Sequence, residues 1–125
     1  MTYVLLSPEL IVRIHDSALN SGELAGMALD KSLEGALARV DNRLVYGMIE
    51  DVFDLAAAYC VAVATGHVFN DTNKQTAHLV LDICLDLNGV QLDHDTVEAG
   101  DLIREVAQRR IDEDTLADWL RAKAT

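Results

Sequence analysis

Basic side chains are scarce in this sequence. Its 125 residues include 10 Lys and Arg against 21 Asp and Glu, which gives a formal net charge of -11. An excess of negative charge of this size repels phosphate backbones and anionic lipid headgroups. We therefore expect the chain to bind neither nucleic acid directly nor a membrane.

Long apolar runs are missing as well. No stretch reaches the roughly 18 apolar residues of a membrane-spanning helix. The first residues also lack the basic and then apolar pattern of a secretory leader. Both absences favour a soluble, cytoplasmic protein.

Cysteine, proline and glycine are few. The two cysteines, Cys60 and Cys84, form no CxxC pair and have no zinc-like spacing, so we expect two reduced, buried thiols. A single proline and 7 glycines leave little room for linkers or for the turns of a sheet-rich fold. Because 50% of the residues are hydrophobic, the chain can build one core, and we expect a single domain over residues 1–125.

The sequence does contain helix-length apolar patterns joined by short turns. Ser7 and Pro8 begin a first helix that we expect to reach about Asn20, and Asp30 is expected to cap a second one that ends near Tyr46. Two smaller helices are expected to begin within 93–96 and 112–115, with Trp119 and Leu120 docking the last.

Two segments in the middle of the chain are strongly apolar. The segment 50–65 is apolar on every face after its acidic first turn, and another apolar segment runs to Leu87. Helices of this kind lie in the centre of a fold. The sequence thus predicts an all-α fold of about six helices, in which a short loop, 66–72, joins two buried central helices.

Polar chemistry is concentrated in this loop and in the turn that follows it. Lys74 is the only Lys or Arg between Leu44 and Ile103. At the start of a helix it adds charge to free backbone amides and a positive dipole end, which favours binding of phosphate. Asp71 offers a hard oxygen ligand of the kind that Mg²⁺ takes beside nucleotide phosphates, and the histidine His67 is suited to act as a base near neutral pH.

The segment His67–Lys74 resembles the signature of the Fic/Doc superfamily, His-x-Phe-x-Asp/Glu-x-Asn-Lys/Arg-Arg. Lys74, where Fic enzymes usually have glycine, and the trailing Thr76-Ala77 resemble the Doc branch, the death-on-curing toxins. The likeness extends more weakly over residues 7–119. Its agreement with the loop's place between two buried helices makes the motif specific.

The resemblance implies a role for each residue of the motif. His67 would be the catalytic base that takes a proton from the target hydroxyl, and Asp71 would hold Mg²⁺. Asn73, Lys74 and the next residue, Gln75, would bind the phosphates of ATP. Phe69 would anchor the loop in the core.

The resemblance also implies a function. Doc-type toxins belong to toxin-antitoxin modules and use ATP to phosphorylate a threonine of translation elongation factor Tu, which arrests translation. A cognate antitoxin would place a helical C-terminal segment in an apolar groove near the catalytic loop. Fic relatives transfer the nucleotidyl group instead, so AMPylation is an alternative.

The chain departs from the signature at its last position. Gln75 stands where the family has arginine, and it lacks the charge and the bidentate fork that bind phosphate. Such a contact contributes about 1.5–3 kcal/mol, so we expect weakened activity. Thr65 likewise stands where Doc relatives can carry a basic residue. A catalytically impaired member, used for antitoxin binding, is therefore a second alternative.

Several of these residues also have plain structural interpretations. Asp71 and Asn73 are common turn and helix-cap residues, and a single histidine in a helix-joining loop, such as His67, is usually a surface or capping residue. His78, one turn after Lys74, either lines the pocket or packs. The dipeptides His15-Asp16 and His94-Asp95 are found in metal phosphohydrolases, although no further ligands follow at helical spacing.

Overall fold

The computed structural model describes residues 2–28, 31–70, 72–92 and 96–124. Within these ranges the chain forms six α-helices and no strand, which confirms the all-α prediction. The helices are α1 (Pro8–Ala18), α2 (Leu33–Val45), α3 (Val52–Gly66), α4 (Asn73–Leu87), α5 (Thr96–Ala107) and α6 (Glu113–Lys123).

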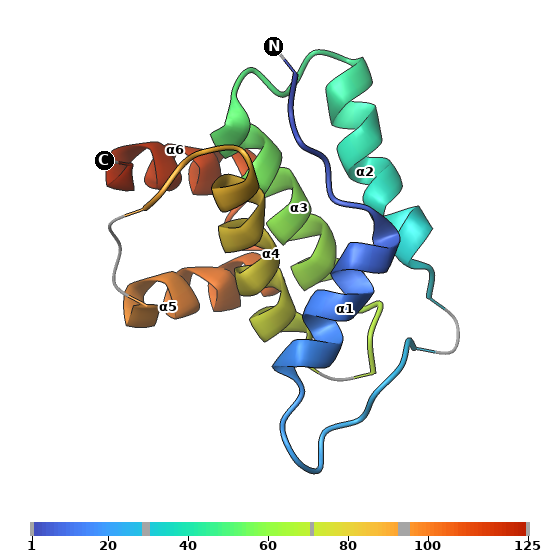
Figure 1. Ribbon diagram of the computed structural model, residues 1–125. Coiled ribbons are helices and arrows are strands. Elements are labelled where there is room, and N and C mark those ends of the chain that lie inside the picture. Colours follow the sequence, from blue (N-terminus) through green and yellow to red (C-terminus); the bar gives the residue numbers. More distant parts are fainter. Residues whose placement is uncertain (1, 29–30, 71, 93–95, 125) are drawn as a thin grey trace.

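Helix α3 lies at the centre of the molecule (Figure 1). It contacts α2, α4, α5 and α6, and its most extensive packing is against α4. Every residue from Leu55 to Thr65 is buried. Many of them are alanines, whose small side chains let neighbouring helices approach closely on all sides.

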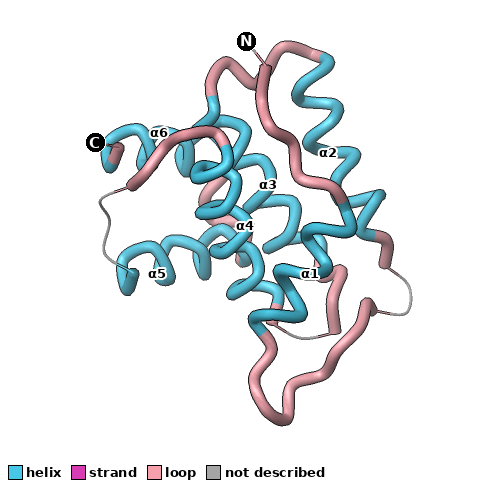
Figure 2. The backbone as a smooth tube through the Cα atoms, in the orientation of Figure 1, coloured by secondary structure: helices cyan, strands magenta, loops and turns pink. Residues whose placement is uncertain are grey.

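The central pair α3 and α4 is arranged as the sequence predicts. The inward face of α4 includes Val80, Leu81 and Leu85, all buried against the core. The short loop between the two helices emerges beside the end of α1 and the long connection from α1 to α2 (Figure 2). The polar loop therefore joins the two most deeply buried helices of the fold, α3 and α4.

Several helix ends follow the expected signals. Ser7 caps α1 and Asp112 caps α6, in each case by accepting a hydrogen bond from a backbone amide of the first turn. The helix α5 begins at Thr96, at the end of the expected range, whereas 93–95 lie outside the described residues. After α4, Leu92 forms an isolated antiparallel bridge with Ala124.

The start of α2 differs from expectation. Asp30 lies outside the described residues, and the observed cap is Ser32, whose hydroxyl accepts from the Gly35 amide at 3.1 Å. Serine and aspartate are nearly equivalent as caps, so residue preference could not distinguish the two positions.

Ion pairs join the outer helices to the core. On α2, Arg39 donates to buried Glu113 of α6 from Nε at 2.7 Å and from Nη2 at 3.1 Å. Arg121 of α6 donates to Asp51 and Asp54 at the start of α3, at 2.8 and 2.6 Å. The pKa of Asp51 is held below its ordinary value, chiefly by this hydrogen bond from Arg121.

Two further expectations concern the apolar residues. Cys60 and Cys84 are both free and buried, and burial raises the pKa of each thiol to about 12. Leu120 is fully buried, and Trp119 docks α6 on α5 by donating from Nε1 to Glu98 at 2.9 Å. None of the helices in the described ranges is long and apolar enough to cross a membrane.

Candidate active site

In the loop between α3 and α4, His67 is exposed, whereas Val68 and Phe69 after it are buried. His67 ends α3 in the left-handed conformation, with φ 48° and ψ 39°. Only a few per cent of residues other than glycine adopt a positive φ, because the Cβ atom then crowds the backbone. The surrounding packing therefore holds the imidazole at the surface, where a proton acceptor can reach a substrate.

Phe69 anchors this loop in the core, as the resemblance implies. Its side chain is 3% exposed, and its ring stacks on the ring of His15 with centroids 3.9 Å apart and an interplanar angle of 6°. Val68, which precedes it, is also buried. The buried side chains of Val68 and Phe69 thus fix the position from which His67 projects.

His15 takes part in this packing. It is fully buried on α1, and its Nδ1 lies 3.3 Å from Asp16 Oδ1. Across the described ranges, no group of three or more His, Cys, Asp or Glu side chains gathers to hold a metal ion. The phosphohydrolase interpretation of His15-Asp16 thus finds no support, and His94-Asp95 lies outside the described residues.

Asn73, the first residue of α4, closes the loop from within. Its Nδ2 donates to the carbonyl oxygen of Phe69 at 3.0 Å, and its Oδ1 accepts from the Phe69 amide at 3.2 Å. This pair of bonds mimics the pairing of two peptide groups. The proposed phosphate role of Asn73 stays a prediction, to which the structure adds a positioning role.

A segment before α2 holds the loop from outside. The Ala28 amide donates to Val68 O at 2.6 Å, and the Asn70 amide donates to Gly26 O at 3.1 Å. These bonds flank an antiparallel bridge between Met27 and Phe69. Sequence reasoning missed this support, because main-chain hydrogen bonds place few demands on side-chain identity.

Thr72 connects the same segment to the start of α4. Its hydroxyl donates to Glu23 Oε2 at 2.7 Å, and this hydrogen bond is the main cause that lowers the pKa of Glu23. Thr72 has a positive φ of 67° and makes no side-chain cap hydrogen bond to α4. By contrast, the residues that precede α1, α2, α3 and α6 each cap their helix. Among the described residues, no side-chain cap from Thr72 blocks the positive end of α4, and such an end suits an anion.

The residues of the motif meet in one cleft at this end of α4. Lys74 and Gln75, in the first turn, are exposed, as is His67. The cleft has a volume of about 360 Å³. Its lining consists of Ala64, His67, Asn70, Thr72, Asn73, Lys74, Gln75 and Ala107. The structure thus brings together four of the five predicted site residues, and the fifth, Asp71, lies outside the described residues.

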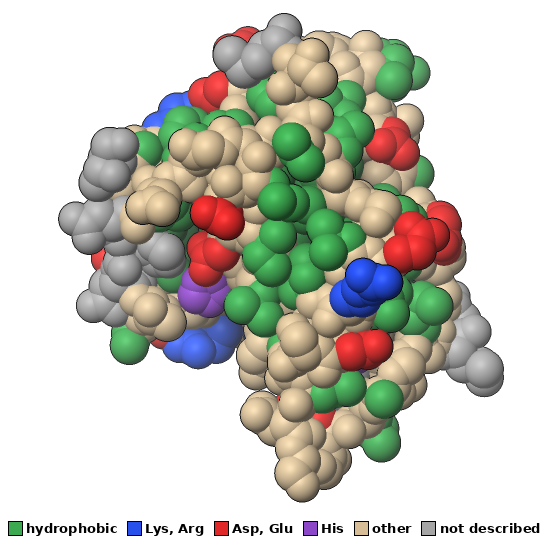
Figure 3. Space-filling model, in the orientation of Figure 1, with side chains coloured by type: hydrophobic (Ala, Val, Ile, Leu, Met, Phe, Trp, Pro, Cys, Tyr) green, Lys and Arg blue, Asp and Glu red, His purple; other side chains and the backbone are tan. Residues whose placement is uncertain are grey.

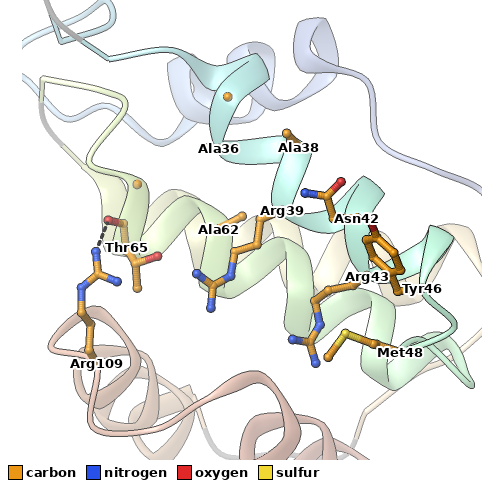
Figure 4. Close-up of a pocket in the computed structure, with 12 residues that line it drawn as sticks. Ala36, Ala38, Arg39, Asn42, Arg43, Tyr46, Met48, Ala62, Thr65 and Arg109 are labelled. Carbon is orange, nitrogen blue, oxygen red and sulfur yellow. Dashed lines mark hydrogen bonds between the residues drawn. The ribbon is translucent and has the colours of Figure 1, made fainter.

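A larger cavity of about 560 Å³ lies on the other side of the α3 terminus (Figure 4). Arg39 and Arg43 of α2 line it, and Arg109 enters it from the turn after α5. Arg109 Nη2 donates to the carbonyl oxygen of Thr65 at 3.4 Å. The Arg109 guanidinium thus lies beside Thr65, the position at which Doc relatives can carry a basic residue. The backbone of Arg109 has a positive φ of 63°.

Comparison with known proteins agrees with this site. A sequence model of the Fic/DOC family matches residues 5–85, which include the whole loop, all of α3 and most of α4. The chain is 39% identical to "Protein kinase doc" of Escherichia phage P1 over 117 residues, which are 93% of this chain and 92% of that protein.

A second relative comes from a bacterium. The chain is 40% identical over 89 residues to "Toxin Doc" of Mycolicibacterium smegmatis (strain ATCC 700084 / mc(2)155), with 68% of each chain covered. The signature loop, the helical fold and both relatives agree, so the chain belongs to the Fic/Doc family, on its Doc branch.

Proposed function

We propose that this chain is a Doc-type toxin that transfers the γ-phosphoryl group of ATP to a hydroxyl group of a protein. The observation that carries this proposal is the cleft that His67, Lys74 and Gln75 share at the uncapped start of α4. The names of the two relatives, a protein kinase and a toxin, support phosphoryl transfer and a toxic role.

The proposed reaction needs one base and a set of phosphate contacts. His67 accepts the proton of the acceptor hydroxyl while the hydroxyl oxygen forms a bond to the γ-phosphorus. The bond between the γ-phosphorus and the β,γ-bridging oxygen breaks, and ADP leaves with that electron pair. Phosphoryl transfer depends mainly on positioning and on neutralising charge, which Lys74 and the amides of α4 provide.

Magnesium fits this chemistry with one protein carboxylate. Mg²⁺ binds through one or two carboxylates together with nucleotide phosphates, and not through a dedicated cage of protein ligands. We propose Asp71 as that carboxylate, and the bound ion would neutralise phosphate charge. The Asp71→Asn variant should then require more magnesium for activity, whereas an unchanged magnesium dependence would remove Asp71 from this role.

The acceptor that we propose is a threonine of translation elongation factor Tu, so that the reaction arrests translation. A protein acceptor is consistent with the exposure of His67 at the mouth of the cleft. A hydroxyl on the surface of another folded protein can approach an exposed base without unfolding.

The partner that we propose is an antitoxin whose C-terminal segment folds as an amphipathic helix against the chain. Leu24 and Met27, beside the signature loop, are 63% and 49% exposed and offer apolar contacts for such a helix. Hydrophobic side chains also gather over the middle of the face shown in Figure 3. Failure of the small protein encoded next to this chain to bind or neutralise it would contradict this partner.

Labelled ATP distinguishes the candidate reactions. The chain is incubated with elongation factor Tu, and separately with a bacterial lysate, using γ-labelled and α-labelled ATP in parallel. We expect transfer of the γ label alone, and transfer of the α label would establish nucleotidyl transfer instead. His67→Ala should abolish labelling, while Gln108→Ala, at an exposed residue after α5 that lines neither cavity described above, serves as the matched control.

A binding module without catalysis is the second candidate, and Gln75 is the observation that favours it. Gln75 is exposed in the first turn of α4, where an arginine would contribute a permanent charge to the cleft. This candidate predicts antitoxin binding without transfer of either label.

A further inference from the structure

A second cavity adjoins the signature cleft on the side of α5. Its volume is about 300 Å³, and it lies between the first turns of α4 and the middle of α5. Its lining consists of Lys74, Gln75, His78, Gly100, Ile103 and Arg104. Because Lys74 and Gln75 line both spaces, a polyphosphate held at the start of α4 can extend from one into the other.

Arg104 gives this cavity a cation from a different helix. Among the described residues that line either space, Lys74 and Arg104 are the two with a Lys or Arg side chain. They reach the cavity from α4 and α5 respectively, so they face it from two sides. The residue after Lys74 is Gln75, where the family signature has arginine. In this chain Arg104 of α5 supplies a guanidinium to the same cavity.

The present partner of Arg104 is weakly held. Arg104 pairs with Asp101 one turn earlier, and the two side chains are 58% and 61% exposed. Ion pairs between exposed side chains contribute little to stability, because water and salt screen them. A phosphate, with more negative charge than a carboxylate, can displace Asp101 without disturbing the core.

Gly100 keeps the cavity open. A Cβ atom built at this helical glycine would meet nothing within 4 Å, so neither a neighbour nor the backbone requires glycine there. Glycine inside a helix is less favourable than alanine. Gly100 thus leaves open space in the cavity that Arg104 also lines.

On the basis of the proposed function, we propose that Arg104 binds a phosphate group of the donor nucleotide in this cavity, opposite Lys74. Arg104 thereby performs from α5 the role for which the family signature uses an arginine at position 75. On this assignment the site keeps the positive charge of the motif arginine, which Arg104 supplies from α5 instead of residue 75 from α4.

Direct binding of AMP-PNP with magnesium tests this assignment without any acceptor protein. For Arg104→Gln we expect a dissociation constant roughly 10- to 100-fold larger than that of the parent, because a charge-assisted hydrogen bond is lost. Arg110→Gln is the matched control, because Arg110 is similarly exposed at 62%, pairs with a carboxylate, Glu105, and lines neither of the two spaces. That variant should bind as tightly as the parent, and circular dichroism checks that both variants fold.

A double variant tests whether the two positions are equivalent. Adding Gln75→Arg to Arg104→Gln should restore most of the lost affinity, because either guanidinium can contact the same phosphate. Gly100→Leu should weaken binding by filling the cavity while leaving both charges in place. Asp101→Asn should strengthen binding modestly, since it removes the competitor for Arg104.

The outcomes separate this inference from the proposed function. If the parent binds AMP-PNP and Arg104→Gln binds it equally well, the assignment of Arg104 is wrong and the proposed function stands. If binding falls but Gln75→Arg does not restore it, Arg104 does not replace the motif arginine. If the parent binds no nucleotide, both the assignment and the proposed function are overturned.

Discussion

The side-chain amide of Asn73 forms both of its hydrogen bonds with the main chain of Phe69, at 3.0 and 3.2 Å. The first residue of α4 thus fixes the residue whose ring stacks on His15. A signature position that would be assigned to phosphate binding alone also holds the loop in shape.

Replacing Asn73 with alanine should destabilise the chain as well as impair the site. Loss of the two bonds to Phe69 should lower the free energy of unfolding by about 1–3 kcal/mol, at roughly 0.5–1.5 kcal/mol for each neutral hydrogen bond. Urea denaturation of Asn73→Ala and its parent measures the difference. An unchanged midpoint would mean that the segment before α2 holds the loop by itself.

Removing the imidazole of His67 should separate activity from stability. His67→Ala should lose transferase activity and toxicity while remaining folded, because the side chain is exposed. His67→Gly should be equally inactive but about 1 kcal/mol more stable than His67→Ala, since glycine accepts a φ of 48° without crowding. Toxicity of either variant at the expression level of the parent would contradict the assignment of the base.

Adding the motif arginine should strengthen the site. Gln75→Arg places a guanidinium at the uncapped end of α4, beside Lys74. In the Arg104→Gln background, where neither position carries a guanidinium, we expect roughly a 10- to 100-fold faster turnover of ATP if the contact strengthens in the transition state, and mainly tighter ATP binding if it does not. Steady-state kinetics resolve the two, and Gln75→Lys tests whether charge without the bidentate fork suffices. A variant that changed neither quantity would show that residue 75 does not face the phosphates.

The ion pair between α2 and α6 should make stability depend on pH. Burial acts to raise the pKa of Glu113, but hydrogen bonds from Arg39 and the charges of Arg39 and Arg43 outweigh it and lower the pKa below its ordinary value of 4.5. A carboxylate with a lowered pKa stabilises the fold above its ordinary pKa, and this contribution is lost as the pH falls through the folded-state value.

Glu113→Gln tests this pH dependence. At neutral pH the variant should be about 1–3 kcal/mol less stable than the parent, because it leaves Arg39 without its carboxylate. As the pH falls below 4.5 and through the folded-state pKa of Glu113, the two stability curves should converge. Parallel curves from pH 3 to pH 7 would mean that the pair contributes no charge-dependent stability.

The two thiols should be inert in the folded chain. Because burial raises the pKa of Cys60 and Cys84 to about 12, neither forms appreciable thiolate at pH 8. Mass spectrometry after treatment with iodoacetamide should show no modification without denaturant and two modifications in guanidinium chloride. Rapid labelling of the native chain would show that α3 or α4 opens locally.

The parts of the fold that sequence predicted are those that side chains encode directly. The apolar run before Thr65 predicted a central helix because burial on every face leaves no room for a polar stripe. The prediction that Asp30 caps α2 was wrong, because Ser32 is the observed cap and both residue types cap helices well.

The candidate site was predicted for similar reasons, within similar limits. The spacing from His67 to Gln75 sufficed to bring these side chains into one cleft, because a helix end fixes its first turn. Arg104 and Arg109 were not found, because their approach to the site depends on how α5 packs, and no local pattern specifies that.

The bridge between Met27 and Phe69 makes the position of His67 depend on the segment before α2. A partner that bound Leu24 and Met27 and displaced their segment would break the main-chain hydrogen bonds at Val68 and Asn70. The loop that positions His67 would then lose this support.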